Sequence, residues 1–400
     1  MSWPKCRLDE YFEITSSKRV FKSEWKSSGV PFYRAREVVK LSQDGYVDNE
    51  LFISEAMFQD YKSKYGVPAT GDILITGVGT LGKVYIVREG DKFYFKDGNI
   101  IWLKKKKEID SKYVDYAIKT SAVQSFIQNS SGATVGTYTI SRANETEIPL
   151  PPLPIQKKIA AVLAKADELR RRREEQIKRL DDLLHATFLD MFGDPVTNPK
   201  GWPIHRLGEF VKEFRYGTSG KSSYEKVGYP ILRIPNIIGD SIVLGDLQHN
   251  DMKEAEYERL RLIENDLLFV RTNGNPDYTG RCALIEKEQE GFVYASYLIR
   301  ARIDDHRIVH HYLLSLLRSE GLRSQLKRKS KTSAGQFNIN IEGLSGLDIL
   351  LPSRPLQEKF SLFYCSLMRK KFELIKNSHS LENLFSSLMQ RAFKGELDLK

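Results

Sequence analysis

The sequence predicts an α+β protein: two similar globular domains with twisted mixed sheets, separated by two long antiparallel coiled-coil-like helices related by a pseudo-twofold internal duplication. Three observations predict this fold class. A segment rich in proline occurs twice, a long helical pattern follows each copy, and patterns of strands and turns precede each copy. The length of 400 residues agrees with this organisation, because at ~150 residues per domain such a chain forms two or three domains.

The internal repeat is the most informative feature of the sequence. Residues 148–159 read IPLPPLPIQKKI and residues 349–360 read ILLPSRPLQEKF, so that Gln156 matches Gln357 at an offset of 201 positions. The same offset continues upstream and downstream without a gap, for example from Leu180 to Leu381. Solenoid repeats have periods of roughly 20–50 residues. The much longer period therefore indicates a duplicated module, in which a globular part is followed by the same kind of tail.

Both tails have the pattern of long helices. Apolar positions recur at alternating spacings of three and four, from Ile159 to Leu183 and again from Phe360 to Leu388. This 3.5-residue seam is typical of helices that pack along their length. No Gly or Pro interrupts residues 155–192. Two such helices can cover each other's apolar stripe as an antiparallel pair; in the alternative, each helix packs only on its own globular part.

The globular parts are expected to consist mainly of strands and turns. Apolar runs that flank glycine-containing turns predict β-hairpins at 71–87 and 265–285, and short helices are expected at 112–128 and 309–327. The predicted boundaries place a first domain at 1–150, a first helix at 151–193, a second domain at 194–351, and a second helix with the C-terminal tail at 352–400.

Composition excludes several classes of protein. With 41% hydrophobic and 28% charged residues the chain is not disordered throughout, and no run approaches the ~18 apolar residues of a membrane span. The charged N-terminus lacks an apolar secretory segment. Cys6, Cys282 and Cys365 lie too far apart for a disulfide framework or a CxxC zinc site. We therefore expect a cytoplasmic protein without a membrane partner.

The charge balance suggests a polyanionic partner. Lys and Arg total 62 against 52 Asp and Glu, which gives a net charge of +10. A basic excess on a folded protein is compatible with nucleic-acid binding.

The sequence resembles the DNA specificity (S) subunit of type I restriction-modification systems. The resemblance depends on the two proline-containing segments, 148–160 and 349–360, on the helices behind them and on the GDILIT…GTLGKVYIV stretch at 71–87. It covers essentially the whole chain in the order domain, helix, domain, helix. The second segment departs from the first where Ser353-Arg354 replaces Pro152-Leu153.

The resemblance implies a non-catalytic subunit. Each globular part would be a target recognition domain that reads half of a bipartite, asymmetric site in double-stranded DNA, and the paired helices would form the spacer and dock methyltransferase (M) subunits, two of them, with restriction/translocase (R) subunits joining for cleavage. The chain itself would bind no cofactor: S-adenosylmethionine would lie on the M subunits, and ATP and Mg²⁺ on the R subunits. The alternatives are a subunit of a related type IIB-like system, a stand-alone DNA-modifying enzyme and a structural coiled-coil protein.

Motifs for catalysis are weak. Gly77 to Gly82 fits GxGxxG, but a strand rather than a helix is expected to follow, and Val84 stands where a P-loop needs Ser or Thr. A glycine-rich hairpin turn is the better interpretation. Pro151-Pro152 opens a helix and cannot form a methyltransferase base pocket, and no HExxH motif is present. The sequence therefore predicts no catalytic and no metal-ligating residue.

Basic and polar clusters are the candidate DNA contacts, because Lys and Arg bind phosphates while Asn, Gln and Arg can read base edges. The main ones are a lysine run expected to follow a strand and two loops at matching offsets, 130–139 and 326–340; solvated loops are the alternative. The candidate residues are Arg34, Lys104, Lys105, Lys106, Lys107, Thr134, Thr137, Tyr138, Arg233, Asn236, Arg271, Asn273, Lys327, Arg328, Lys329, Lys331, Gln336 and Asn338.

Overall fold

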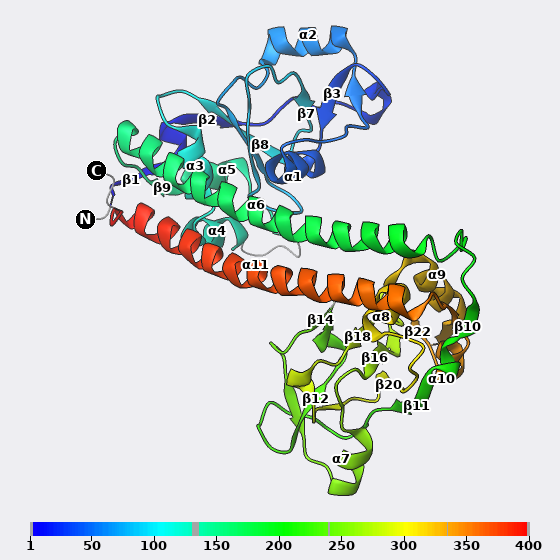
Figure 1. The fold of residues 1–400 in the computed structure, drawn as a ribbon. Coiled ribbons are helices and arrows are strands. Elements are labelled where there is room, and N and C mark those ends of the chain that lie inside the picture. Colours follow the sequence, from blue (N-terminus) through cyan, green and yellow to red (C-terminus); the bar gives the residue numbers. More distant parts are fainter. Residues whose placement is uncertain (1–2, 130–135, 239–240, 334, 398–400) are drawn as a thin grey trace. The chain divides into compact units, whose positions relative to one another are not determined.

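The structure, a computed structural model, describes residues 3–129, 136–238, 241–333 and 335–397. The chain divides into two compact units (Figure 1): unit 1 contains Met1–Glu175 and Lys376–Lys400, and unit 2 contains Gln176–Ile375. The long helices α6 (Leu153–Phe192) and α11 (Arg354–Lys394) each contribute one half to each unit. The domain boundaries expected from the sequence, at 150, 193 and 351, stay predictions.

Unit 1 contains three sheets. A four-stranded antiparallel sheet has the order β2-β8-β5-β6, a three-stranded sheet has the order β4-β3-β7 with β3 and β7 parallel, and β1 pairs with β9. The strands are β1 (Lys5–Arg7), β2 (Phe12–Thr15), β3 (Val30–Tyr33), β4 (Phe52–Ile53), β5 (Ile73–Thr76), β6 (Val84–Ile86), β7 (Tyr94–Phe95), β8 (Ile100–Lys105) and β9 (Glu147–Pro149). The short helices are α1 (Ala35–Asp44), α2 (Glu55–Tyr65), α3 (Ser111–Ile118), α4 (Ser121–Gln128) and α5 (Ile140–Glu145).

Unit 2 repeats these three sheets in the same order, as β11-β20-β16-β18, β15-β12-β19 and β10-β23, and it has two further small sheets, β17-β22-β21 and β13-β14. The strands are β10 (Ile204–Arg206), β11 (Val211–Tyr216), β12 (Tyr229–Leu232), β13 (Ile237–Ile238), β14 (Ser241–Ile242), β15 (Gln248–Asn250), β16 (Leu267–Val270), β17 (Thr272–Asn273), β18 (Cys282–Leu284), β19 (Val293–Tyr294), β20 (Leu298–Ile303), β21 (Lys331–Ser333), β22 (Gln336–Asn338) and β23 (Asp348–Leu350). The short helices are α7 (Glu254–Leu260), α8 (His310–Arg318), α9 (Glu320–Lys329) and α10 (Ile341–Ser345).

The shared sheet order confirms the duplicated α+β fold. The expected hairpins form as β5–β6 and as β16–β18. The short helices expected at 112–128 and 309–327 form, and each range is divided into two of them, α3 and α4 in unit 1 and α8 and α9 in unit 2. In unit 2 the side chain of Ser319 accepts a hydrogen bond from the backbone N–H of Leu322 and caps a new helix there, which ends α8 and turns the chain.

The two long helices are antiparallel, because the first half of α6 shares unit 1 with the last half of α11 and the reverse holds in unit 2. In unit 1, Arg170 lies 3.0 Å from Glu382 and its guanidinium lies over the ring of Phe385. In unit 2, Lys371 pairs with Asp181. The end of α6 also packs in the core of unit 2 and the end of α11 in that of unit 1, so the alternative in which each helix packs only on its own globular part is wrong.

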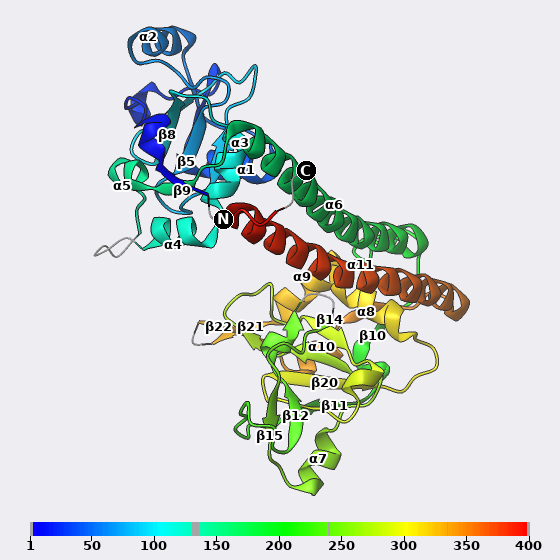
Figure 2. The ribbon, with the colours of Figure 1, turned by 90° about the vertical axis from the view of Figure 1, so that its left-hand side faces the viewer.

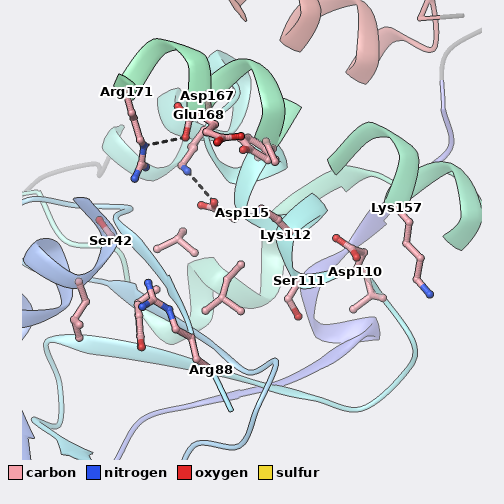
Figure 3. A pocket seen from close by; sticks show the side chains of 18 of the residues that line it. Ser42, Arg88, Asp110, Ser111, Lys112, Asp115, Lys157, Asp167, Glu168 and Arg171 are labelled. Atoms are coloured by element: carbon pink, nitrogen blue, oxygen red, sulfur yellow. Dashed lines mark hydrogen bonds and ion pairs between the residues drawn. The ribbon is translucent and has the colours of Figure 1, made fainter. Parts of the chain in front are cut away.

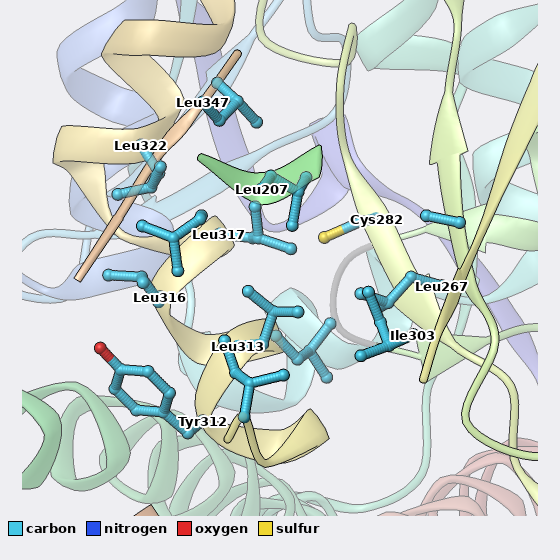
Figure 4. Close-up of a cluster of buried hydrophobic side chains, with 14 of the residues drawn as sticks. Leu207, Leu267, Cys282, Ile303, Tyr312, Leu313, Leu316, Leu317, Leu322 and Leu347 are labelled. Atoms are coloured by element: carbon cyan, nitrogen blue, oxygen red, sulfur yellow. The ribbon is translucent and has the colours of Figure 1, made fainter. Parts of the chain in front are cut away.

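The core of unit 2 lies between its four-stranded sheet, α8 and the long helices. Figure 4 shows Tyr312, Leu313 and Leu316 on α8 next to Leu267 and Cys282 of the sheet. The ring of Phe192 on α6 lies 4.6 Å from that of Tyr312. The helices are therefore part of the core of the unit.

A glutamine at the start of each long helix explains why the repeated segment is the most similar part of the two halves. Gln156 and Gln357 are both buried. The side-chain oxygen of Gln156 accepts from the N–H of Asp110, and that of Gln357 accepts from the N–H of Val309, while each amide N–H donates to the carbonyl five residues earlier. Each glutamine thus links a long helix to the start of a short helix, α3 or α8.

Replacing Gln357 by Leu is expected to lower the free energy of unfolding by ~1–3 kcal/mol, because the N–H of Val309 would lose its partner in a buried site. Denaturant unfolding followed by circular dichroism measures this change. Gln390→Leu, at an exposed position on the same helix, should stay within about 0.5 kcal/mol of the wild type. Equal effects of the two substitutions would contradict the assigned role of Gln357.

Candidate nucleic-acid interface

Unit 2 brings several of the candidate residues onto one small sheet, β17-β22-β21. Asn273 pairs with Phe337, and Lys331 pairs with Asn338. Figure 2 shows β21 and β22 at one side of the unit. The expectation of a loop at 326–340 is therefore wrong: the segment consists of the last turn of α9, a β-hairpin and Asn340, the N-cap of α10. The hairpin holds the amides and Lys331 in a fixed register that a loop would not provide.

Cations and amides are adjacent on this surface, which we call the β22 surface and define as Lys327, Arg328, Lys329, Lys331, Gln336, Asn338 and Asn273. Lys331 and Gln336 are exposed, and Asn338 is half-buried. The side-chain oxygen of Gln336 accepts from the hydroxyl of Thr272 at 2.9 Å, which leaves its amide N–H groups for a ligand. Lysines bind phosphates and amides read base edges, so the β22 surface has both kinds of group that sequence-specific DNA binding needs.

Arg271 extends this surface at the end of β16. Its guanidinium carbon lies 4.7 Å from the ring centroid of Tyr216, and one of its nitrogens is 3.4 Å from the carbonyl oxygen of Ser296. Stacking of this kind restricts the guanidinium and leaves donors at its edge. Arg271 directly precedes β17, so it lies two residues before Asn273.

Two candidates in unit 2 have structural contacts instead. Asn236 is fully buried: its side-chain oxygen accepts from the N–H of Arg233, and its amide nitrogen donates to the carbonyl of Val243. Arg233 forms an ion pair with Asp246 at 2.8 Å. A buried amide with both groups satisfied offers no surface to a base. The two residues stabilise the turn that follows β12.

Arg34 occupies the corresponding place in unit 1, directly after β3. Its backbone N–H donates to the carboxylate of Glu37 at 2.8 Å, and its guanidinium pairs with the same carboxylate. The pKa of Glu37, which burial alone would raise, is lowered by these hydrogen bonds from Arg34 and by one from Arg36. Arg34 therefore stabilises the first turn of α1.

Tyr138 is a core residue. It is 2% exposed, its hydroxyl lies 2.7 Å from that of Thr146, and its N–H donates to the carbonyl of Gly77. Ile339 makes the equivalent backbone bond to Arg271 in unit 2. The offset of 201 already pairs Tyr138 with this isoleucine, so the sequence contained the signal for a buried position.

The other two candidates of that segment are Thr137 and Thr134. Thr137 is half-buried next to Tyr138, at the position that corresponds to Asn338. Thr134 lies outside the described residues.

The lysine run lies elsewhere in unit 1. Lys104 and Lys105 belong to β8, so the expectation that the run follows a strand is wrong. The register of the sheet places Ile100 opposite Thr76 and Lys105 opposite Phe12. The run therefore lies at the opposite end of β8 from the Gly77 turn, and the structure does not bring Lys104, Lys105, Lys106 and Lys107 together with Thr137.

Contacts within the protein occupy most of this run. The ammonium of Lys104 lies 4.4 Å from the ring centroid of Trp102, Lys106 donates to the carbonyl of Asp9, and the ammonium of Lys107 lies 5.3 Å from the ring of Tyr11. The backbone N–H of Lys106 donates to the carbonyl of Tyr11, and in unit 2 the backbone N–H of Asp304 makes the corresponding hydrogen bond to Phe210. An acidic residue at the equivalent place gives no support to a phosphate contact shared by both units.

A cavity of about 840 Å³ in unit 1 collects charges of both signs between α3, α6 and the sheet. Figure 3 shows Arg171 and Asp167 of α6 facing Asp115 of α3. Arg171 pairs with Asp167 at 3.1 Å, and Lys119 pairs with Asp115 at 2.8 Å. Burial raises the pKa of Asp115. The opposite charges largely pair with each other, so the cavity does not have the excess of one sign that an ionic ligand would require.

The structure gives no support to catalytic motifs. The GxGxxG stretch forms the turn of the β5–β6 hairpin, without the helix that a nucleotide loop requires. Across residues 3–129, 136–238, 241–333 and 335–397, no group of three or more His, Cys, Asp or Glu side chains could hold a metal ion. In the same ranges, no helix has the length and apolar character needed to cross a bilayer.

The fold defines a class of protein in which two similar domains are combined with two long paired helices. The family model described as "Type I restriction modification DNA specificity domain" matches residues 2–179. The specificity subunit of the type I restriction enzyme EcoKI from Escherichia coli is 28% identical over 320 residues, which are 74% of this chain and 67% of that protein. The putative specificity subunit S.HindORF215P from Haemophilus influenzae is 33% identical over 164 residues, 40% of each chain.

Solved structures agree in fold. The type I restriction-modification S subunit from M. genitalium is similar with a TM-score of 0.58, at 18% identity and over 98% of this chain and 96% of that one. Residues 2–179 thus match the DNA specificity domain of type I restriction-modification systems, and 74% of the chain is similar to the specificity subunit of one such system. This similarity supports the role of a DNA specificity subunit.

Proposed function

We propose that the chain reads a bipartite, asymmetric site in double-stranded DNA, with one half-site for each copy of the duplicated domain. The observation that carries this proposal is the β22 surface, where Lys331 stands beside the amides of Gln336 and Asn338 on a regular hairpin and further cations lie on the last turn of α9. The net charge of +10 supports a polyanionic ligand. The low similarity of the two domains outside the repeated segments fits half-sites of different sequence.

The chain would act as the adaptor of a larger enzyme. Two M subunits would dock on it, because the duplicated helix starts around Gln156 and Gln357 provide two similar local structures. R subunits would complete the complex for cleavage. S-adenosylmethionine would be held by the M subunits, and ATP and Mg²⁺ by the R subunits, while this chain supplies sequence recognition and binds none of them.

Replacing Gln336 or Asn338 by Ala is expected to relax the preference at one base position by ~1–3 kcal/mol, because an amide can form two hydrogen bonds with one base edge. Selection of bound duplexes from random DNA, by the chain together with its M subunits, measures this preference. Only one half-site should change. Gln248→Ala, an amide on β15 in another sheet of unit 2, should leave both half-sites unchanged. A change in both half-sites, or in neither, would contradict the assignment.

A further inference from the structure

A second cavity in unit 2 is strongly basic. It has a volume of about 350 Å³ and lies where the turn before β18 meets the end of α8 and one face of α9. We call it the α9 pocket. The charged residues that line it are Arg281, Arg318, Arg323, Lys327 and Asp277. Among the described lining residues, four cations thus face a single carboxylate.

The carboxylate does not neutralise the arginines. The carboxylate of Asp277 accepts a hydrogen bond from the ammonium of Lys327, with 2.5 Å between Oδ1 and Nζ, and this hydrogen bond lowers the pKa of Asp277. The Nε of Arg281 donates to the backbone carbonyl of Asp277 at 3.0 Å, and Nη2 of Arg323 donates to the carbonyls of Asp277 and Thr279, each at 2.9 Å. Carbonyl groups satisfy N–H donors without cancelling the charge. Arg281, Arg323 and Lys327 together with Asp277 therefore leave an excess of about two positive charges.

The two arginines are held in place for a ligand. The guanidinium carbon of Arg281 lies 3.9 Å from the ring centroid of Tyr278. Arg323 is largely buried, and its burial lowers the pKa of its guanidinium. Its Nη1 has no hydrogen-bond partner within the described part of the chain. A buried donor without a partner is costly, and an anion bound at Arg281 would stabilise the positive charge of Arg323, which lines the same pocket.

The pocket is connected rigidly to the β22 surface. The hydroxyl of Thr279, in the turn that Arg281 and Arg323 hold, lies 3.2 Å from the carbonyl of Phe337 in β22 and donates to it. Gly280 in the same turn has φ +73°, and a Cβ there would lie 2.9 Å from the side chain of Leu326. A group bound in the pocket would therefore have a fixed position relative to Gln336 and Asn338.

We propose that the α9 pocket binds a phosphodiester group of the DNA half-site that unit 2 reads, with Arg281 and Lys327 as the contacts and Arg323 as an additional positive charge. This inference rests on the proposed function and deepens it. Planar guanidinium groups match phosphate oxygens bidentately. The bound phosphate would set the register of the duplex, and the amides of β22 would then read the bases.

The test compares two double variants with equal loss of charge. Arg281→Gln with Lys327→Gln removes two pocket cations, and Lys212→Gln with Lys287→Gln removes two exposed lysines from other parts of unit 2. The affinity of the full chain for a random-sequence duplex is measured over a range of salt concentrations. The pocket variant should lose about 1.8 from the slope of log affinity against log salt, at about 0.9 for each phosphate contact, and the control should keep the wild-type slope.

Further measurements separate the possible outcomes. A wild-type chain that binds no DNA would overturn the proposed function together with this inference. If the wild type binds with a steep slope and both double variants share it, only the pocket assignment is wrong. Lys327→Gln alone, at an exposed side chain, should lose about 0.9 and covers the case in which the double variant does not fold. If inorganic phosphate raises the melting temperature of the wild type alone while the salt slopes are equal, the pocket is a free-anion site and the DNA assignment falls.

Discussion

Replacing Phe360 by Ala is expected to destabilise the protein by ~3–5 kcal/mol, the largest effect on stability that the structure predicts for a single side chain. Phe360 lies on α11 and is fully buried. Its ring centroid lies 5.6 Å from that of Phe188 and 5.4 Å from that of Phe192, both on α6. The substitution would leave a cavity where the two long helices meet the core of unit 2, and the contacts of the Phe360 ring with α6 would be lost.

Phe372→Ala is the matched control for this prediction. Phe372 lies on the same helix, within unit 2, but its side chain is 70% exposed. Its replacement should change the free energy of unfolding by less than about 0.5 kcal/mol. Chemical denaturation of both variants provides the comparison. Similar losses in the two variants would mean that Phe360 does not join the helices to the core.

The second large effect concerns DNA affinity. Replacing Lys327, Arg328, Lys329 and Lys331 by Ala is expected to weaken binding to most sequences and to flatten its dependence on salt. Each phosphate contact releases counterions and adds about 0.9 to the slope of log affinity against log salt, so four contacts would contribute up to about 3.6. A mobility-shift titration of the full chain at several salt concentrations measures both quantities.

A control of equal charge distinguishes local contacts from the effect of net charge. Lys212, Lys226, Lys253 and Lys287 are exposed in unit 2 outside α9 and the β22 surface. Their joint replacement by Ala should lower the slope much less. If both quadruple variants lose the same slope, only the overall charge matters, and the β22 surface is not the interface.

The order of domains and long helices was predictable from the sequence, because the internal duplication repeats the same pattern in both halves of the chain. The offset of 201 residues locates both long helices, and the repeated glutamine marks the buried contact that anchors each helix to its unit. The hairpins around residues 71–87 and 265–285 were predictable from local turn chemistry. Features that both copies must satisfy therefore appear twice in the sequence.

The details of the site were less predictable, because burial and pairing depend on distant residues. Tyr138 and Asn236 are residue types that often contact DNA. In this fold, however, the hydroxyl of Tyr138 and the amide of Asn236 form hydrogen bonds inside the protein. The segment that contains Gln336 is rich in Lys and Ser, which suggests a loop, but pairing with Asn273 and its neighbour in β17 makes it a strand. The same limit applies to the α9 pocket, where Arg281 and Arg323 lie 42 positions apart in the sequence.

A methylation map of DNA exposed to the chain and its M subunits tests the central claim most directly. Single-molecule sequencing of that DNA identifies every methylated position and the bases around it. The duplicated architecture predicts one bipartite sequence, in which two short and different half-sites flank a gap of constant length without base preference. An uninterrupted recognition sequence, or methylation without sequence preference, would contradict the assignment of one half-site to each copy of the domain.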